Sequence, residues 1–79
     1  MSIEELSQKL KEMYEYAPKN EQVANIHLFG IEFGEIIQRN NYRVSQIILM
    51  AEMKRSYCIE LSKGIKLSKF VKLKSSINI

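Results

Sequence analysis

The side chains of this sequence that could take part in chemistry are mainly cations, and they gather in its second half. From Asn40 to Ile79 there are eight lysines and arginines against two glutamates, a net charge of +6, whereas the residues up to Arg39 carry a net charge of −3. Lysine and arginine bind phosphate oxygens, and arginine can also pair with two acceptors on guanine. The asymmetry indicates contact with a nucleic acid or another anionic surface, and the alternative is a solvated lysine face without a partner.

The other residues do not support catalytic or metal-binding chemistry. The chain has one His and one Cys, which excludes an intrachain disulfide and a zinc site made by this chain alone. His27 lies in an apolar stretch and is expected to be half-buried with one hydrogen bond, and Cys58 is expected to be a buried, unreactive thiol. The sequence also has no glycine-rich phosphate loop. We therefore expect no enzyme activity, no cofactor, no metal and no small-molecule ligand.

Length and hydropathy limit the protein further. Its 79 residues allow one small domain, which we expect to span residues 1–73, followed by a frayed tail at residues 74–79. No apolar run approaches the roughly 18 residues of a membrane span, and the acidic residues near the N-terminus are unlike a signal peptide. These features predict a cytoplasmic protein without a membrane partner.

The spacing of apolar residues predicts an all-α fold, a compact bundle of four to five helices. A first helix is expected from about Ile3 to Tyr16, because Ser2 and Glu5 form a capping box and Pro18 ends the helix.

A second helix is expected to follow Asn20 as its N-cap and to contain the apolar stretch Val23–Ile37. Gly30 and Gly34 would either let a neighbouring helix approach closely or break this helix in two, and one helix with a kink is favoured. So much apolar surface is difficult to cover in a small monomer. The Val23–Ile37 region is therefore the expected interface of a homodimer.

Two further helices complete the expected bundle. The third is expected at about Val44 to Ala51, and the fourth from near Lys54 to Lys63, with Gly64 as a left-handed C-terminal cap. A last helical turn or an extended arm would follow, with a short strand over Ile65–Leu73 as a further alternative.

The segment from Ile47 to Gly64 has the spacing of a helix–turn–helix, in which two short helices pack across a turn of about three or four residues. The inward-facing positions would be Ile47, Ile48, Ala51, Met53, Cys58 and Leu61. This spacing resembles the phage-repressor type of helix–turn–helix, with two departures. Glu52 stands where a glycine usually allows a positive φ, and Ile48 stands where a small residue usually lets the helices approach.

In such a motif, the start of the second helix enters the major groove of DNA. Arg55 is the best candidate for reading bases, with Tyr57, Glu60 and Lys63 as further candidates. Phosphate contacts would come from Lys54, Lys66, Lys69 and Lys72. The expected DNA-binding residues are Lys54, Arg55, Ser56, Tyr57, Glu60, Lys63, Lys66 and Lys69, with Lys72 as a further phosphate contact.

Two stretches, Ile26–Ile31 and Glu60–Val71, resemble those of a family of small bacterial helix–turn–helix-like domains. With Glu5-Leu6 and Met13-Tyr14, the resemblance spans about Ser2 to Val71. It implies the helical fold and agrees with DNA binding, and it implies no particular chemistry.

Together these features predict a transcriptional regulator that contacts double-stranded DNA through its basic C-terminal half. The alternative is a helical protein–protein interaction module or a homodimeric adaptor without a nucleic-acid role. Binding to a membrane surface ranks third, because the basic half lacks an aromatic-rich amphipathic helix.

Overall fold

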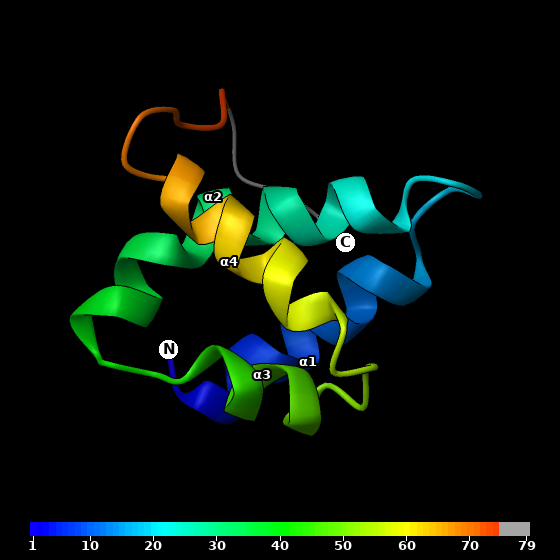
Figure 1. The fold of residues 1–79 in the computed structure, drawn as a ribbon, viewed down its shortest axis with the longest axis horizontal. Helices are drawn as coiled ribbons and strands as arrows, with labels where there is room; N and C mark the ends of the chain where they lie inside the picture. The colour runs from blue at the N-terminus through cyan, green and yellow to red at the C-terminus, as the bar shows by residue number, and fades with distance from the viewer. Residues whose placement is uncertain (75–79) are drawn as a thin grey trace.

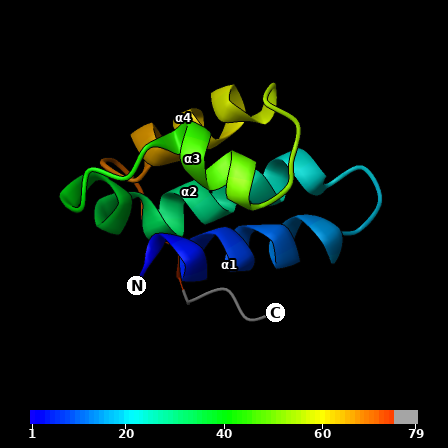
Figure 2. The ribbon, with the colours of Figure 1, turned by 90° about the horizontal axis from the view of Figure 1, so that it is seen from below.

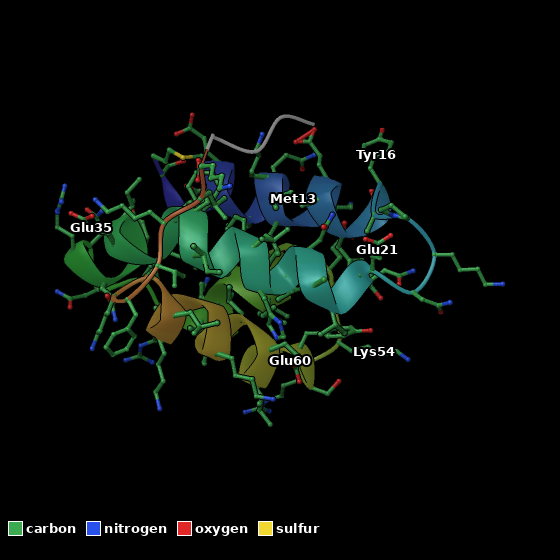
Figure 3. The ribbon with its side chains drawn as sticks, turned by 90° about the horizontal axis from the view of Figure 1, so that it is seen from above. Met13, Tyr16, Glu21, Glu35, Lys54 and Glu60 are labelled. Atoms are coloured by element: carbon green, nitrogen blue, oxygen red, sulfur yellow. The ribbon has the colours of Figure 1, made fainter. Side chains whose placement is uncertain are left out.

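The computed structural model describes residues 1–74, which form four α-helices and no strand (Figure 1). The helices are α1 (Ile3–Glu15), α2 (Gln22–Arg39), α3 (Val44–Met50) and α4 (Tyr57–Leu67). Figure 2 and Figure 3 show α2 running beside α1 on one side and α4 on the other, and α3 packs against both α1 and α4. The predicted all-α bundle is therefore confirmed, with four helices.

The capping box predicted for α1 is present. The Ser2 hydroxyl accepts a hydrogen bond from the Glu5 backbone N–H at 3.1 Å, and the Glu5 carboxylate accepts one from the Ser2 N–H at 2.9 Å. The helix ends at Glu15, with Tyr16 as its C-cap, shortly before Pro18. Its apolar residues at steps of three and four form one buried face, which includes Leu6, Leu10 and Met13.

α2 is a single helix, but the prediction of Asn20 as its N-cap is wrong. Asn20 has a φ of 70°, in the left-handed region, and the N-cap is Glu21, whose side chain makes no capping hydrogen bond. A capping Asn needs an extended backbone so that its side chain can reach the first helical N–H groups. Asn20 instead forms the turn that reverses the chain after α1.

Gly30 and Gly34 do not break α2, because they are buried where α4 crosses it. A Cβ atom added to Gly30 would lie 2.7 Å from backbone atoms of Gly64, and one added to Gly64 would lie 2.5 Å from the carbonyl oxygen of His27. The backbones of the two helices therefore meet at a pair of glycines, and the close approach expected of these residues is confirmed.

This crossing also corrects the prediction for the end of α4. Gly64 is an interior residue of a helix that continues to Leu67, and no glycine in residues 1–74 has a positive φ. A further hydrogen-bonded turn follows, in which the N–H of Val71 donates to the carbonyl of Leu67 at 3.0 Å. The last helical turn is therefore confirmed, while the extended arm and the strand over Ile65–Leu73 are wrong.

The predicted frayed tail at residues 74–79 lies outside the described residues, apart from Lys74.

The connection between α3 and α4 is longer than predicted. α3 ends at Met50, and regular α4 begins at Tyr57 rather than near Lys54. Two hydrogen-bonded turns lead into α4, because the N–H of Tyr57 donates to the Lys54 carbonyl and the N–H of Cys58 donates to the Arg55 carbonyl, both at 3.0 Å. The chain therefore already curls from Lys54 onward.

Glu52 lies in this connection and has a φ of 60°. A helix–turn–helix of the type that the sequence resembles requires a positive φ at this position, so a glutamate occupies the backbone conformation that a glycine would adopt more easily. Its carboxylate forms an ion pair with Lys11 of α1, which ties the turn to the first helix.

The core lies where the four helices meet, and the predicted inward positions of the helix–turn–helix contribute to it. Ile47, Ile48, Ala51 and Leu61 are buried, and Met53 is half-buried against them. The other buried apolar residues are Leu6, Leu10, Met13, Ile26, Phe29, Ile37 and Ile65.

α2 is the central helix, so α1 and α4 cover most of its apolar surface. Val23 is its one large apolar residue that is exposed among the described residues, at 40%. The uncovered surface that suggested a homodimer through Val23–Ile37 is therefore small in the described part of the chain, with Val23 exposed and residues such as Ile31 and Phe33 half-buried, and the dimer stays a prediction.

None of the helices within residues 1–74 combines the length and the hydropathy that crossing a bilayer requires.

Candidate nucleic-acid interface

The solvent-facing side of α4 carries a row of exposed residues at helical spacing. Ile59, Ser62, Lys63 and Lys66 follow one another at steps of three, one and three residues, which places them on one face of the helix. The opposite side is buried and includes Leu61, Gly64 and Ile65. We call the exposed row, together with Arg55 in the turn before it, the α4 outer face.

Exposed polar residues, most of them cations, continue this face at both of its ends. Lys54, labelled in Figure 3, and Ser56 are exposed before the first turn of α4. Lys69 and Lys72 are exposed after its last turn. Four of the predicted phosphate and base contacts, Lys54, Arg55, Lys63 and Lys66, therefore lie on or beside one exposed helix face.

The two acidic residues of this half are held by other helices. The Glu60 carboxylate lies 2.7 Å from Nε2 of His27 on α2 and 3.6 Å from Nζ of Lys63, and its side chain is only 25% exposed. Glu52 is paired with Lys11 of α1. The α4 outer face therefore has more lysines and arginines than neighbouring carboxylates. This excess of positive charge favours an anionic partner.

Two predicted base-reading residues do not point outward. Tyr57 is half-buried, and its hydroxyl lies 3.0 Å from that of Tyr14 on α1, with the rings 5.3 Å apart. Glu60 turns toward His27, as described above. Both side chains flank the buried side of α4 and bind polar partners there. They position the helix in this structure, and their predicted outward orientation is wrong.

The residues considered for catalysis occupy structural positions. His27 is half-buried and makes the predicted single side-chain hydrogen bond, to Glu60. Cys58 is half-buried rather than fully buried, because it lies at the edge of the α4 outer face, in a shallow hollow shared with Ile59 and Ser62. Within residues 1–74, no three His, Cys, Asp or Glu side chains come close enough together to hold a metal ion.

Sequence reasoning missed a second part of this surface, on α3. Gln46 and Leu49 lie three residues apart on the exposed side of α3, and Leu49 is 72% exposed. They line a hollow that also includes Met53 and Arg55, so α3 borders the same surface as the start of α4. The spacing of these two residues was visible in the sequence. One polar and one apolar residue on a short helix, however, do not by themselves indicate a binding surface.

Hydrogen bonds and ion pairs lower the pKa of three carboxyl groups. Hydrogen bonding to His27 lowers the pKa of Glu60, the hydrogen bond from Lys11 lowers that of Glu52, and the Ser2 backbone N–H lowers that of Glu5. The ionised forms are therefore favoured by folding.

These shifts predict that the protein loses stability in acid. Because folding lowers the pKa values from about 4.5, the carboxylates stabilise the folded chain above that pH, and the stabilisation disappears as the pH falls through the lower folded-state values. Thermal unfolding followed by circular dichroism at about pH 6 and about pH 3 should show a smaller acid-induced fall in Tm for Glu60→Gln than for the wild type. Glu21→Gln, which removes an exposed carboxylate without a capping hydrogen bond, is the matched control. An equal fall in the wild type and in Glu60→Gln contradicts the prediction.

Comparison with known proteins agrees with this geometry. Residues 2–74 match the family model described as an HTH-like domain. No curated protein and no solved structure shows significant similarity to the chain. The match covers all four helices and the whole α4 outer face.

Proposed function

Because this chain belongs to the HTH-like domain family, we propose that it is a cytoplasmic DNA-binding transcriptional regulator that places α4 in the major groove of double-stranded DNA. The single observation that carries this proposal is the composition of the α4 outer face. It presents Arg55, Lys63 and Lys66 to solvent, while Glu52 and Glu60 are turned toward α1 and α2.

The dimensions of α4 suit this role. Its 11 residues correspond to a length of about 16 Å, and the major groove is about 12 Å wide, so the helix can reach base edges and the backbone on either side. Arg55, in the turn that leads into α4, is the proposed base-reading residue, and Lys54, Lys66, Lys69 and Lys72 are the proposed phosphate contacts. The positive φ of Glu52 supports a turn of the phage-repressor type between the two helices.

The proposal predicts that the cations of the α4 outer face contribute more to DNA binding than cations elsewhere on the protein, although each carries one positive charge. We expect the double variant Arg55→Ala/Lys63→Ala to bind a mixed-sequence duplex of about 20 base pairs at least tenfold more weakly than the wild type, because it loses the two cations that are candidates for contacting bases. Fluorescence anisotropy of a labelled duplex at about 50 mM salt measures this difference.

The matched control is Lys9→Ala/Lys19→Ala, which removes two positive charges from α1 and from the turn after it. Both double variants have the same net charge, so any effect of overall charge is equal in the two. Equal weakening in the two variants would mean that binding depends on net charge alone, and it would overturn the assignment of the α4 outer face.

A further inference from the structure

Ile59 is an unusual residue for the position that it occupies. Its side chain is 63% exposed, and it lies in the middle of the α4 outer face, one helical turn before Ser62 and Lys63. It is not part of the core, which is formed by the opposite side of the helix around Leu61 and Ile65. Folding therefore does not account for an isoleucine at this point.

The charges around Ile59 restrict what it can contact. Arg55 lies four residues before it, and Lys63 and Lys66 lie four and seven residues after it, all of them exposed. Lysine is depleted in the interfaces between proteins, whereas a nucleic acid requires cations beside the groups that read its bases. The surroundings of Ile59 are therefore complementary to DNA rather than to an apolar protein surface.

DNA offers one apolar group that such a side chain can recognise. In the major groove, the C5-methyl group of thymine is the only methyl group that the four bases display, and apolar side chains read it by direct contact. Ile59 lies on the face that would enter the groove, four residues after Arg55, which lies in the turn before the helix.

From this placement we infer that Ile59 is a specificity-determining residue that contacts the C5-methyl group of a thymine in the bound DNA. The inference rests on the proposed function and deepens it, because it assigns a base to one position of α4. It implies that the preferred site contains a thymine close to the guanine proposed for Arg55.

The test removes the methyl group from the DNA and the side chain from the protein. Duplexes are first selected from a random pool with the wild-type protein, and each thymine of the preferred duplex is then replaced in turn by deoxyuridine. Deoxyuridine keeps every hydrogen-bonding group of thymine and lacks only the methyl group. We expect one or two of these replacements to weaken wild-type binding about threefold to fivefold, the effect of losing one buried methyl contact.

The variant Ile59→Ala should bind the thymine duplex more weakly than the wild type does, by a comparable factor. Replacing the thymine at the same position by deoxyuridine should not lower the affinity of this variant further. Because Ile59 is exposed, the Tm of the variant should remain close to that of the wild type. Val23→Ala, which shortens another exposed β-branched residue on α2, should keep the full sensitivity to deoxyuridine.

The possible failures are distinguishable. If the wild type binds duplexes but no deoxyuridine replacement changes its affinity, or if Ile59→Ala keeps the same sensitivity, the inference about Ile59 is overturned and DNA binding by α4 stands. If the wild type selects no duplex at all, the proposed function itself fails, and the inference about Ile59 fails with it.

Discussion

Replacing Gly64 by alanine is expected to lower the free energy of unfolding by about 2 kcal/mol, although alanine normally stabilises a helix interior by about 1 kcal/mol relative to glycine. The added Cβ would lie 2.5 Å from the carbonyl oxygen of His27 and 3.0 Å from the Cα atom of Gly30. These are backbone atoms of α2, so the contact can be relieved only if the two helices move apart. A small domain is stabilised by only about 5 kcal/mol, so this loss is a large fraction of the total.

Thermal denaturation followed by circular dichroism should show a fall in Tm of roughly 10 °C for Gly64→Ala. Gly30→Ala should change the Tm in the same direction, because its Cβ would meet the backbone of Gly64 at 2.7 Å. Gly34→Ala is the graded control. Its nearest neighbours would be the Oγ and Cβ atoms of the Ser68 side chain, at 2.5 and 2.9 Å, and rotation of that side chain relieves part of the contact. A higher Tm for Gly64→Ala than for the wild type would contradict the close crossing of α2 and α4.

This crossing connects the fold to the proposed function. α2 packs more extensively against α4 than against α1, and the two glycines determine how deeply α4 lies on it. The hydrogen bond that His27 Nε2 donates to the Glu60 carboxylate and the one between the hydroxyls of Tyr57 and Tyr14 then restrict the rotation of α4 about its axis. Together these contacts leave Arg55, Ile59 and Lys63 on the solvent side.

The parts of this structure that were predictable from the sequence are those that local signals determine. The capping box at Ser2 and Glu5 and the apolar spacing of α1 involve residues only a few positions apart, and both predictions are confirmed. The buried positions of α3 and α4, such as Ile47 and Leu61, also follow from helical spacing.

The parts that were not predictable depend on partners far away in the chain. A glycine near the end of a helical pattern suits either a C-terminal cap or a close helix crossing, and only the neighbour Gly30 decides that Gly64 serves the second purpose. The inward turn of Tyr57 and Glu60 likewise depends on Tyr14 and His27, which belong to other helices. Helical spacing predicted that these two side chains face outward, because the sequence does not show which polar groups on the other helices they would meet.

The second large effect is expected from salt. A protein that contacts about six phosphates releases the counterions that those phosphates hold, so its affinity falls about a thousandfold between 50 and 200 mM salt. Six exposed cations lie along this surface. Four are the proposed phosphate contacts Lys54, Lys66, Lys69 and Lys72, and the other two are the base-reading candidates Arg55 and Lys63, whose charges also displace counterions from nearby phosphates. A protein–protein interaction module that uses exposed apolar residues such as Leu49 and Phe70 has no reason to respond in this way.

Single alanine variants show which residues cause the salt dependence of binding. Each lysine or arginine that contacts a phosphate should reduce the slope of log affinity against log salt by about one when it is replaced by alanine. Lys66→Ala is therefore expected to flatten the slope, whereas Lys9→Ala on α1 should leave it unchanged.

The central claim, that the basic surface around α4 binds double-stranded DNA, is tested most directly by the affinity of the wild-type protein for a mixed-sequence duplex across this range of salt. We predict measurable binding at about 50 mM salt that weakens about a thousandfold by about 200 mM. No binding to any duplex at about 50 mM, or binding whose strength does not change with salt, would contradict the claim.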